Sequence, residues 1–109
     1  LYQGKKVVVT PLAENSDGNK AHGTEVYYHT THSAVPASRL LETYTAQVNR
    51  RNLGAKNGYY RVTLLPQSPS MLIELGFMCN PAEYENLTNP AVIQQSAQGI
   101  VDGILAALR

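Results

Sequence analysis

The sequence predicts an α/β domain in which a mixed, mainly parallel sheet is flanked by helices. Short β-branched or alternating runs occur in turn with longer runs whose apolar residues recur at helical spacing. Strands that alternate with helices favour at least some parallel pairing in a layered sheet. A chain of 109 residues is long enough for one small domain with its own core, so we predict a single domain over residues 1–109.

The first strands are predicted from β-branched and alternating residues. Three valines at 7–9 are typical of a buried strand, which Pro11 would end, and the polar stretch 13–20 predicts a loop with a turn at Asp17-Gly18. In "GTEVYYHT" (23–30), apolar and polar side chains alternate, which predicts a second strand.

A helix is predicted over residues 36–51 because leucine, tyrosine and valine side chains recur there at helical spacing. Ser33 or Ser38 could provide its N-cap. The stretch Asn52-Leu53-Gly54 resembles a helix stop.

Two further strands are predicted around a turn. "GYYRVTLL" (58–65) is interpreted as a strand and residues 66–69 as the turn. "SMLIEL" (70–75) is nearly all apolar, which predicts a central strand that is covered on both faces.

Two helices are predicted to complete the chain. Asn80, Pro81 and Glu83 supply an N-cap, a proline at the first helical position and an acidic third residue, so a short helix begins there. A long amphipathic helix follows from near Pro90. Its apolar stripe consists of Ile93, Ala97, Ile100, Ile104 and Leu108, flanked by Val101 and Leu105.

Composition excludes several classes of function. Hydrophobic residues make up 43% and charged residues 16%, with a formal net charge of +1, so nothing in the charge indicates binding to nucleic acid. The apolar runs are too short for a membrane-spanning segment. Cys79 is the only cysteine, which excludes an internal disulfide and a CxxC metal site. Because the chain opens on Leu1 without a targeting segment, we expect it to be a piece of a longer protein.

Glu74 is the most informative single residue, because it is one carboxylate inside a strongly apolar strand. Burying an isolated carboxylate costs several kcal/mol unless it is neutralised, hydrogen-bonded or paired. At the C-terminal end of a strand it would face a ligand cleft, as a general base or a metal partner. The alternative is a structural role in which Glu74 pairs with Arg61, Lys56 or a backbone amide.

The segment "SPSMLIELGFMCNPAEYENL" resembles a motif of the zinc-dependent N-acetylmuramoyl-L-alanine amidases, the cell-wall hydrolase family called Amidase_3. The matching residues are Pro69, Ser70, Leu72, Glu74, Gly76, Phe77, Asn80, Pro81 and Glu83. "AHGTEVYYH" is similar to a second family strand, at Gly23, Val26, Tyr27 and Tyr28. "NRRNLGAKNGYYRVTLL" and the closing "QQSAQGIVDGILAAL" extend the resemblance from about residue 20 to the end.

The resemblance implies that this chain is the C-terminal portion of an amidase catalytic domain, and so an incomplete piece of a larger α/β domain. Family members hydrolyse the amide between N-acetylmuramic acid and L-alanine of peptidoglycan, using a Zn²⁺-bound water. By motif position, Glu74 would be the catalytic residue that deprotonates this water. Peptidoglycan is then the expected partner and substrate, an activator protein is possible but unidentified, and the expected location is extracellular, in the cell wall or periplasm.

The sequence departs from the family at the zinc site. A family histidine ligand aligns with Pro11, Leu12 or Ala13, none of which binds zinc. The resemblance places the other two ligands before Leu1, so no zinc ligand is recognisable in residues 1–109. The alternative function is therefore a catalytically inactive, metal-free relative that serves as a cell-wall binding or regulatory module.

The remaining candidate residues carry weaker signals. His22, His29 and His32 are the only histidines, and a solvated surface position is the more ordinary role for each. Cys79 lacks the nearby histidine that a nucleophile needs. Tyrosine rings could stack on sugar rings, but packing within the fold is the commoner use, and no substrate-binding residue is assigned. The tyrosines concerned are Tyr27, Tyr28, Tyr59 and Tyr60.

Overall fold

The structure is a computed structural model that describes the backbone of residues 8–10 and all of residues 20–109. The predicted strand end at Pro11 and all but the last residue of the predicted loop 13–20 lie outside the described residues.

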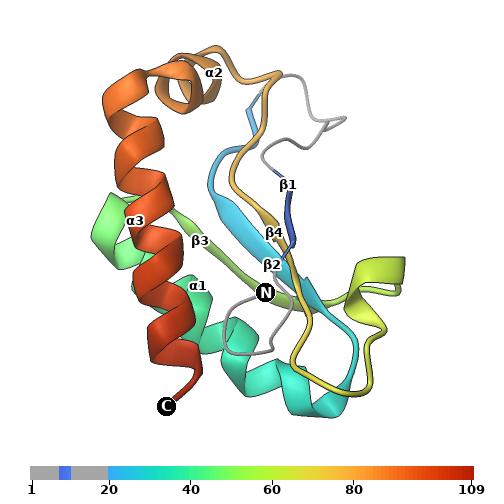
Figure 1. The fold of residues 1–109 in the computed structure, drawn as a ribbon. Coiled ribbons are helices and arrows are strands. Elements are labelled where there is room, and N and C mark those ends of the chain that lie inside the picture. The colour runs from blue at the N-terminus through green and yellow to red at the C-terminus, as the bar shows by residue number, and fades with distance from the viewer. Residues whose placement is uncertain (1–7, 11–19) are drawn as a thin grey trace.

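A four-stranded sheet forms the centre of the fold (Figure 1). Its strands stand in the order β1 (Val8–Thr10), β4 (Leu72–Glu74), β2 (Thr24–Tyr28) and β3 (Asn52–Asn57). The β1–β4 and β2–β3 pairs are parallel and the β2–β4 pair is antiparallel. This confirms the predicted mixed, mainly parallel sheet with the 70–75 segment at a central position.

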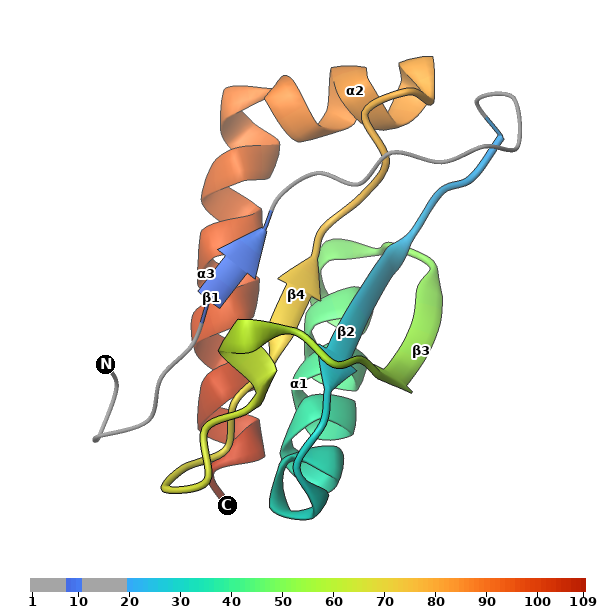
Figure 2. The ribbon, with the colours of Figure 1, turned by 90° about the vertical axis from the view of Figure 1, so that its right-hand side faces the viewer.

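Two helices, α1 (Ala34–Val48) and α3 (Pro90–Ala107), lie on the same side of the sheet, as Figure 2 shows. Val26 and Ile73 alternate toward these helices and are fully buried. The core that forms around them also contains Ala37, Leu40, Leu41, Tyr44, Met71 and Leu75. The other face of β4 carries Leu72 and Glu74, and Leu72 is only 8% exposed. The predicted central strand that is covered on both faces is thus confirmed at Leu72 and Ile73.

The helix predicted over 36–51 is α1, which begins and ends earlier than expected. A 3₁₀ turn, η1 (Thr31–Ser33), precedes it. Ser33 occupies the N-cap position but makes no capping hydrogen bond. Its hydroxyl instead accepts a hydrogen bond from the backbone N–H of Ser70 at 3.0 Å, while Ser38 lies inside the helix. The helix ends at Asn49, which adopts the left-handed conformation with φ 54°.

The predicted helix stop at 52–54 and the predicted strand at 58–65 are both wrong, because the third strand is β3 at Asn52–Asn57. Residues 58–65 instead contain a 3₁₀ turn, η2 (Arg61–Thr63). The buried hydroxyl of Thr63 shares its single proton between the carbonyl oxygens of Gly58 and Tyr60, at 2.7 and 2.8 Å, and so fixes this turn. Thr63, although β-branched, therefore stabilises a turn here and is not part of a strand.

Both C-terminal helices begin where the sequence predicts. The side chain of Asn80 accepts hydrogen bonds from the N–H groups of Ala82 and Glu83, which caps α2 (Pro81–Thr88). Asn89 caps α3 in the same way through the N–H of Ala91 at 2.9 Å. None of the described helices is long and apolar enough to cross a membrane.

The buried face of α3 is displaced from the predicted stripe. Ser96, Gly99 and Gly103 are its buried residues, whereas Ile93, at the start of the predicted stripe, is 53% exposed. Small residues form this contact face because they allow α3 to approach α1 closely. Ile100 and Ile104 lie at its border and pack against the core.

Candidate active site around Glu74

Glu74 is the last residue of β4 and stands between two strands. Thr10 of β1 is its parallel neighbour, and Glu25 of β2 is its antiparallel neighbour. Because Ile73 points into the core beneath the helices, alternation directs Glu74 to the opposite face of the sheet. The side chain is half-buried there. The sequence prediction that Glu74 lies at the C-terminal end of a central strand is confirmed.

Glu25 is the immediate partner of Glu74 on this face. It is buried, with only 6% of its surface exposed. Its carboxylate accepts a hydrogen bond from the Lys56 ammonium at 2.5 Å and another from the Tyr27 hydroxyl at 2.9 Å. Lys56 lies on β3 beside Tyr27 in the parallel register. The lysine that the sequence offered as a possible partner of Glu74 thus forms its ion pair with Glu25.

The two carboxyl groups differ in their proton affinity. Burial and the adjacent Glu25 carboxylate raise the pKa of Glu74 to about 6. Burial also acts to raise the pKa of Glu25, but the hydrogen bonds from Lys56 and Tyr27 outweigh it, so the pKa of Glu25 is lowered. The pair therefore consists of one carboxyl that stays ionised and one that can exchange a proton near neutral pH.

An ion pair secures the chain just beyond Glu74. The Glu83 carboxylate accepts a hydrogen bond from Arg50 at 2.5 Å, and the two side chains are only 11% and 5% exposed. Its second oxygen accepts hydrogen bonds from the backbone N–H groups of Gly23 and Phe77 at 3.3 and 3.1 Å. The sequence predicted Glu83 as a helix-start residue and as a motif position. In the structure its carboxylate also binds Arg50 and the backbone N–H groups at the start of β2 and after β4.

Two glycines are required by this arrangement. A Cβ atom at Gly76 would lie 2.5 Å from the Glu83 carboxylate and 2.7 Å from the Arg50 guanidinium. Gly23 has φ 115°, and its Cβ would lie 2.7 Å from the carbonyl oxygen of Arg51. At Gly76 the backbone thus lies directly against the buried ion pair.

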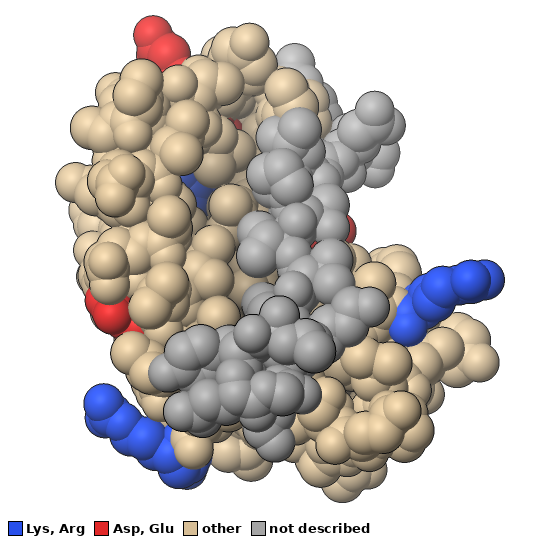
Figure 3. All heavy atoms as spheres, in the orientation of Figure 1, with Lys and Arg blue, Asp and Glu red and all other residues tan. Residues whose placement is uncertain are grey.

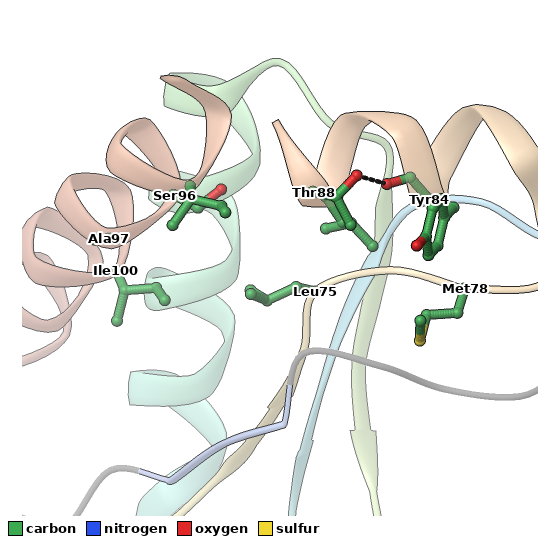
Figure 4. Close-up of a pocket in the computed structure, with 9 residues that line it drawn as sticks. Leu75, Met78, Tyr84, Thr88, Ser96, Ala97 and Ile100 are labelled. Atoms are coloured by element: carbon green, nitrogen blue, oxygen red, sulfur yellow. Dashed lines mark hydrogen bonds between the residues drawn. The ribbon is translucent and has the colours of Figure 1, made fainter. Parts of the chain in front are cut away.

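Two hollows open near the end of β4. A polar hollow of about 350 Å³ is lined by residues that include His22, Arg50, Asn80 and Glu83. An apolar hollow of about 430 Å³ lies between α2 and α3, as Figure 4 shows. Its lining includes Leu75, Met78, Tyr84, Leu87, Ile93 and Ile100. Glu74 lines neither hollow, and its role as a catalytic base stays a prediction.

The histidines do not converge on Glu74. His22 approaches the carbonyl oxygen of Lys20 at 3.3 Å, and His29 approaches the side chain of Asn57 at 3.2 Å. His32 contacts the carbonyl oxygen of Ser68 at 3.1 Å. No three His, Cys, Asp or Glu side chains in the described part of the chain are grouped so that they could hold a metal ion. These residues therefore do not fit a zinc ion.

The tyrosines divide between the core and the Glu74 face. Tyr28 packs against the core, whereas the ring of Tyr27 meets Tyr60 edge-on at 5.3 Å. Tyr59 is 76% exposed and its ring lies 5.0 Å from that of His29. Cys79 is half-buried in the turn between β4 and α2.

Sequence reasoning missed Glu25 and Arg50 as members of this region. Glu25 could have been found from the sequence, because it is a carboxylate next to Val26 in a predicted strand and so lies on the face opposite that buried residue. No sequence feature predicts the role of Arg50, because its contact with α2 depends on the left-handed conformation of Asn49.

The fold and the motif together define a class of cell-wall amidase. The sequence profile of the N-acetylmuramoyl-L-alanine amidase family, Amidase_3, matches residues 12–106. The chain therefore belongs to this family, as the resemblance around Glu74 implied.

Individual relatives agree with the family assignment. N-acetylmuramoyl-L-alanine amidase LytC of Bacillus subtilis is 30% identical over 101 residues, which cover 89% of this chain and 20% of LytC. YqiI, an uncharacterised protein of the same organism, is 32% identical, with 83% of this chain and 46% of YqiI covered. The chain thus spans less than half the length of these relatives.

Solved structures show the same fold. An N-acetylmuramoyl-L-alanine amidase of Clostridium difficile 630 superposes with a TM-score of 0.84 at 31% identity, covering 94% of this chain and 57% of that one. The catalytic domain of CwlV, an N-acetylmuramoyl-L-alanine amidase from Bacillus (Paenibacillus) polymyxa var. colistinus, gives 0.80 at 28% identity with the same coverage.

Proposed function

We propose that the protein containing this chain is an N-acetylmuramoyl-L-alanine amidase, which hydrolyses the amide between N-acetylmuramic acid and L-alanine of peptidoglycan. The observation that carries the proposal is the family match over residues 12–106. In this proposal residues 1–109 form the C-terminal portion of the catalytic domain, and the protein acts at the cell wall, outside the cytoplasmic membrane.

Glu74 would act as the general base of this reaction. Its carboxylate would accept a proton from the attacking water, whose oxygen bonds to the amide carbon. As the carbon–nitrogen bond breaks, the same carboxyl would return the proton to the leaving amine of L-alanine. A pKa of about 6 suits both halves of this transfer, because neither protonation state is strongly favoured near neutral pH.

We further propose that the whole protein uses Zn²⁺, which the family resemblance implies. Because the described residues hold no group that fits the ion, its ligands would have to come from other parts of the protein. Metal analysis of the full-length protein, before and after treatment with a chelator, tests this point directly.

The activity is tested with full-length protein and purified peptidoglycan, by measuring newly released amino termini of L-alanine. We expect Glu74→Gln to lower the rate by roughly 10²–10⁴-fold, the usual contribution of a general base, while the fold is retained. Glu42→Gln on the exposed face of α1 is the matched control and should leave the rate unchanged. Full activity in Glu74→Gln would refute the role of this residue.

A metal-free cell-wall binding module is the second candidate function. It is favoured by the absence of a metal-binding group among the described residues and by Pro11, Leu12 and Ala13 at the expected ligand position. This candidate predicts that full-length protein sediments with peptidoglycan, contains no zinc and releases no L-alanine amino termini.

A further inference from the structure

Glu25 is a buried carboxylate for which the proposed reaction provides no role. It faces Glu74 across the antiparallel β2–β4 pair and is almost fully enclosed. Like charges at directly opposed positions of two strands are destabilising, and a buried carboxylate adds a desolvation cost. Hydrogen bonds or a cation at the Glu25 carboxylate are needed to offset these two costs.

The compensating contacts come from two strands. Lys56 of β3 and Tyr27 of β2 both donate hydrogen bonds to Glu25, each to a different carboxylate oxygen. Tyr27 is in turn held by the edge-on ring of Tyr60, the residue before η2. The Lys56 side chain is 46% exposed, but the Glu25 side chain that it contacts is only 8% exposed. The Glu25 carboxylate is thus fixed in position and charge.

We propose that Glu25 is a positioning residue for Glu74: its fixed carboxylate, directly opposite Glu74 in the antiparallel β2–β4 register, holds the Glu74 carboxyl group in place for proton transfer. The inference rests on the proposed function of Glu74. It assigns no contact with substrate to Glu25, which acts only through its neighbour.

The electrostatics support this role. The groups that act on Glu74 from the described strands are Glu25, which raises its pKa, Lys56, which lowers it, and Tyr27, which faces the same carboxyls. Glu25 and Glu74 are directly opposed in the antiparallel register, so their side chains are neighbours on the same face of the sheet. Loss of the Glu25 charge should therefore lower the pKa of Glu74, and loss of the Lys56 charge should raise it.

Two variants of the full-length protein separate these effects. In Glu25→Gln we expect the acidic limb of the pH–rate profile to move to lower pH by about one unit, because the base loses its proton more easily. In Lys56→Met the same limb should move to higher pH. Glu25→Asp should restore part of the wild-type profile, and Glu42→Gln should leave it unchanged.

A second measurement does not depend on activity. Carbon-13 NMR titration of the glutamate carboxyls in chelator-treated, full-length protein should show the pKa of Glu74 lowered in Glu25→Gln and raised in Lys56→Met. An unchanged Glu74 titration in both variants would overturn the inference. If Glu25→Gln does not fold, Glu25→Asp replaces it: because the charge is withdrawn by one methylene group, the pKa of Glu74 should fall by less than in a charge-removing variant, and an unchanged value would overturn the inference.

The outcomes also separate this inference from the proposed function. If Glu74→Gln is inactive but Glu25→Gln keeps the wild-type pH profile, only the role of Glu25 fails. If Glu74→Gln is fully active while the NMR shifts appear, the carboxyl pair exists but does not perform the proposed hydrolysis.

Discussion

The Glu83–Arg50 ion pair joins three segments that are far apart in the sequence. Glu83 lies in α2, Arg50 follows α1, and the remaining hydrogen bonds of Glu83 go to Gly23 and Phe77. All three contacts converge on the Glu83 carboxylate, close to the turn that follows β4. A buried pair with its lone pairs satisfied holds geometry more than it adds stability, but removal of one partner is costly.

We therefore predict that Glu83→Gln lowers the free energy of unfolding by about 3 kcal/mol, because Arg50 is left as a buried and uncompensated charge. Glu85→Gln is the matched control: it makes the same change on the exposed face of α2 and should cost less than about 0.5 kcal/mol. Urea unfolding of the full-length variants measures both. Equal losses would mean that the ion pair has no special structural role.

The sequence identified Glu74 but not its surroundings. One carboxylate among the apolar residues of β4 is visible in any reading of the chain, and its motif position follows from the resemblance. The sequence offered Lys56 as a possible partner of Glu74 but did not predict Glu25 beside it, because the contact between Lys56 and Glu25 depends on the position of β3. Once residues 58–65 are taken as the strand, Lys56 falls in a loop and the contact cannot be predicted.

At the scale of elements, α1 and α3 approach each other through glycines. A Cβ atom at Gly103 would lie 3.0 Å from the backbone oxygen of Leu40, and one at Gly99 would lie 3.0 Å from a methyl group of Val48. Glycine within a helix costs about 1 kcal/mol of stability relative to alanine. The packing of α1 against α3 therefore has to stabilise the fold by more than this amount.

Gly103→Ala should consequently destabilise the protein by about 1–2 kcal/mol, despite the better helix propensity of alanine, because the new methyl group meets backbone that cannot rotate away. Gln95→Ala, on the exposed face of α3, should change stability by less than about 0.5 kcal/mol. Thermal unfolding of the two variants compares them. A stabilised Gly103→Ala would show that α1 and α3 can separate without loss.

The sequence predicts elements well where local residues determine them and poorly where contacts with other elements do. The starts of α2 and α3 were predicted because Asn–Pro pairs fix a helix start locally. β3 was missed because it is an edge strand of this sheet with polar, largely exposed residues, stabilised by pairing with β2 and not by its own propensity. The true contact face of α3 was missed because small residues carry no apolar signal.

At the scale of the molecule, one side is apolar and exposed. Ile93, Ala97, Val101 and Leu105 follow one another at four-residue intervals along α3 and are all exposed. This ridge continues the apolar hollow beneath α2, and Figure 3 shows few charged side chains over these two helices. The C. difficile structure contains further chain beyond the 57% that superposes here. Exposed apolar patches of this kind mark surfaces that other chain covers.

Residues 1–109 on their own should therefore self-associate and bind a hydrophobic dye, because nothing charged interrupts the ridge. The double variant Val101→Lys, Leu105→Lys should reduce both effects, since it places two cations at positions that are 47% and 39% exposed. Val35→Lys is the matched control, because Val35 is 57% exposed on α1 and is not a residue of the ridge, so its change should alter neither. Sedimentation velocity and dye fluorescence over a concentration series provide the measurements. A monomeric wild-type chain without dye binding would contradict the prediction, and equal effects of all three lysines would attribute association to net charge and not to this surface.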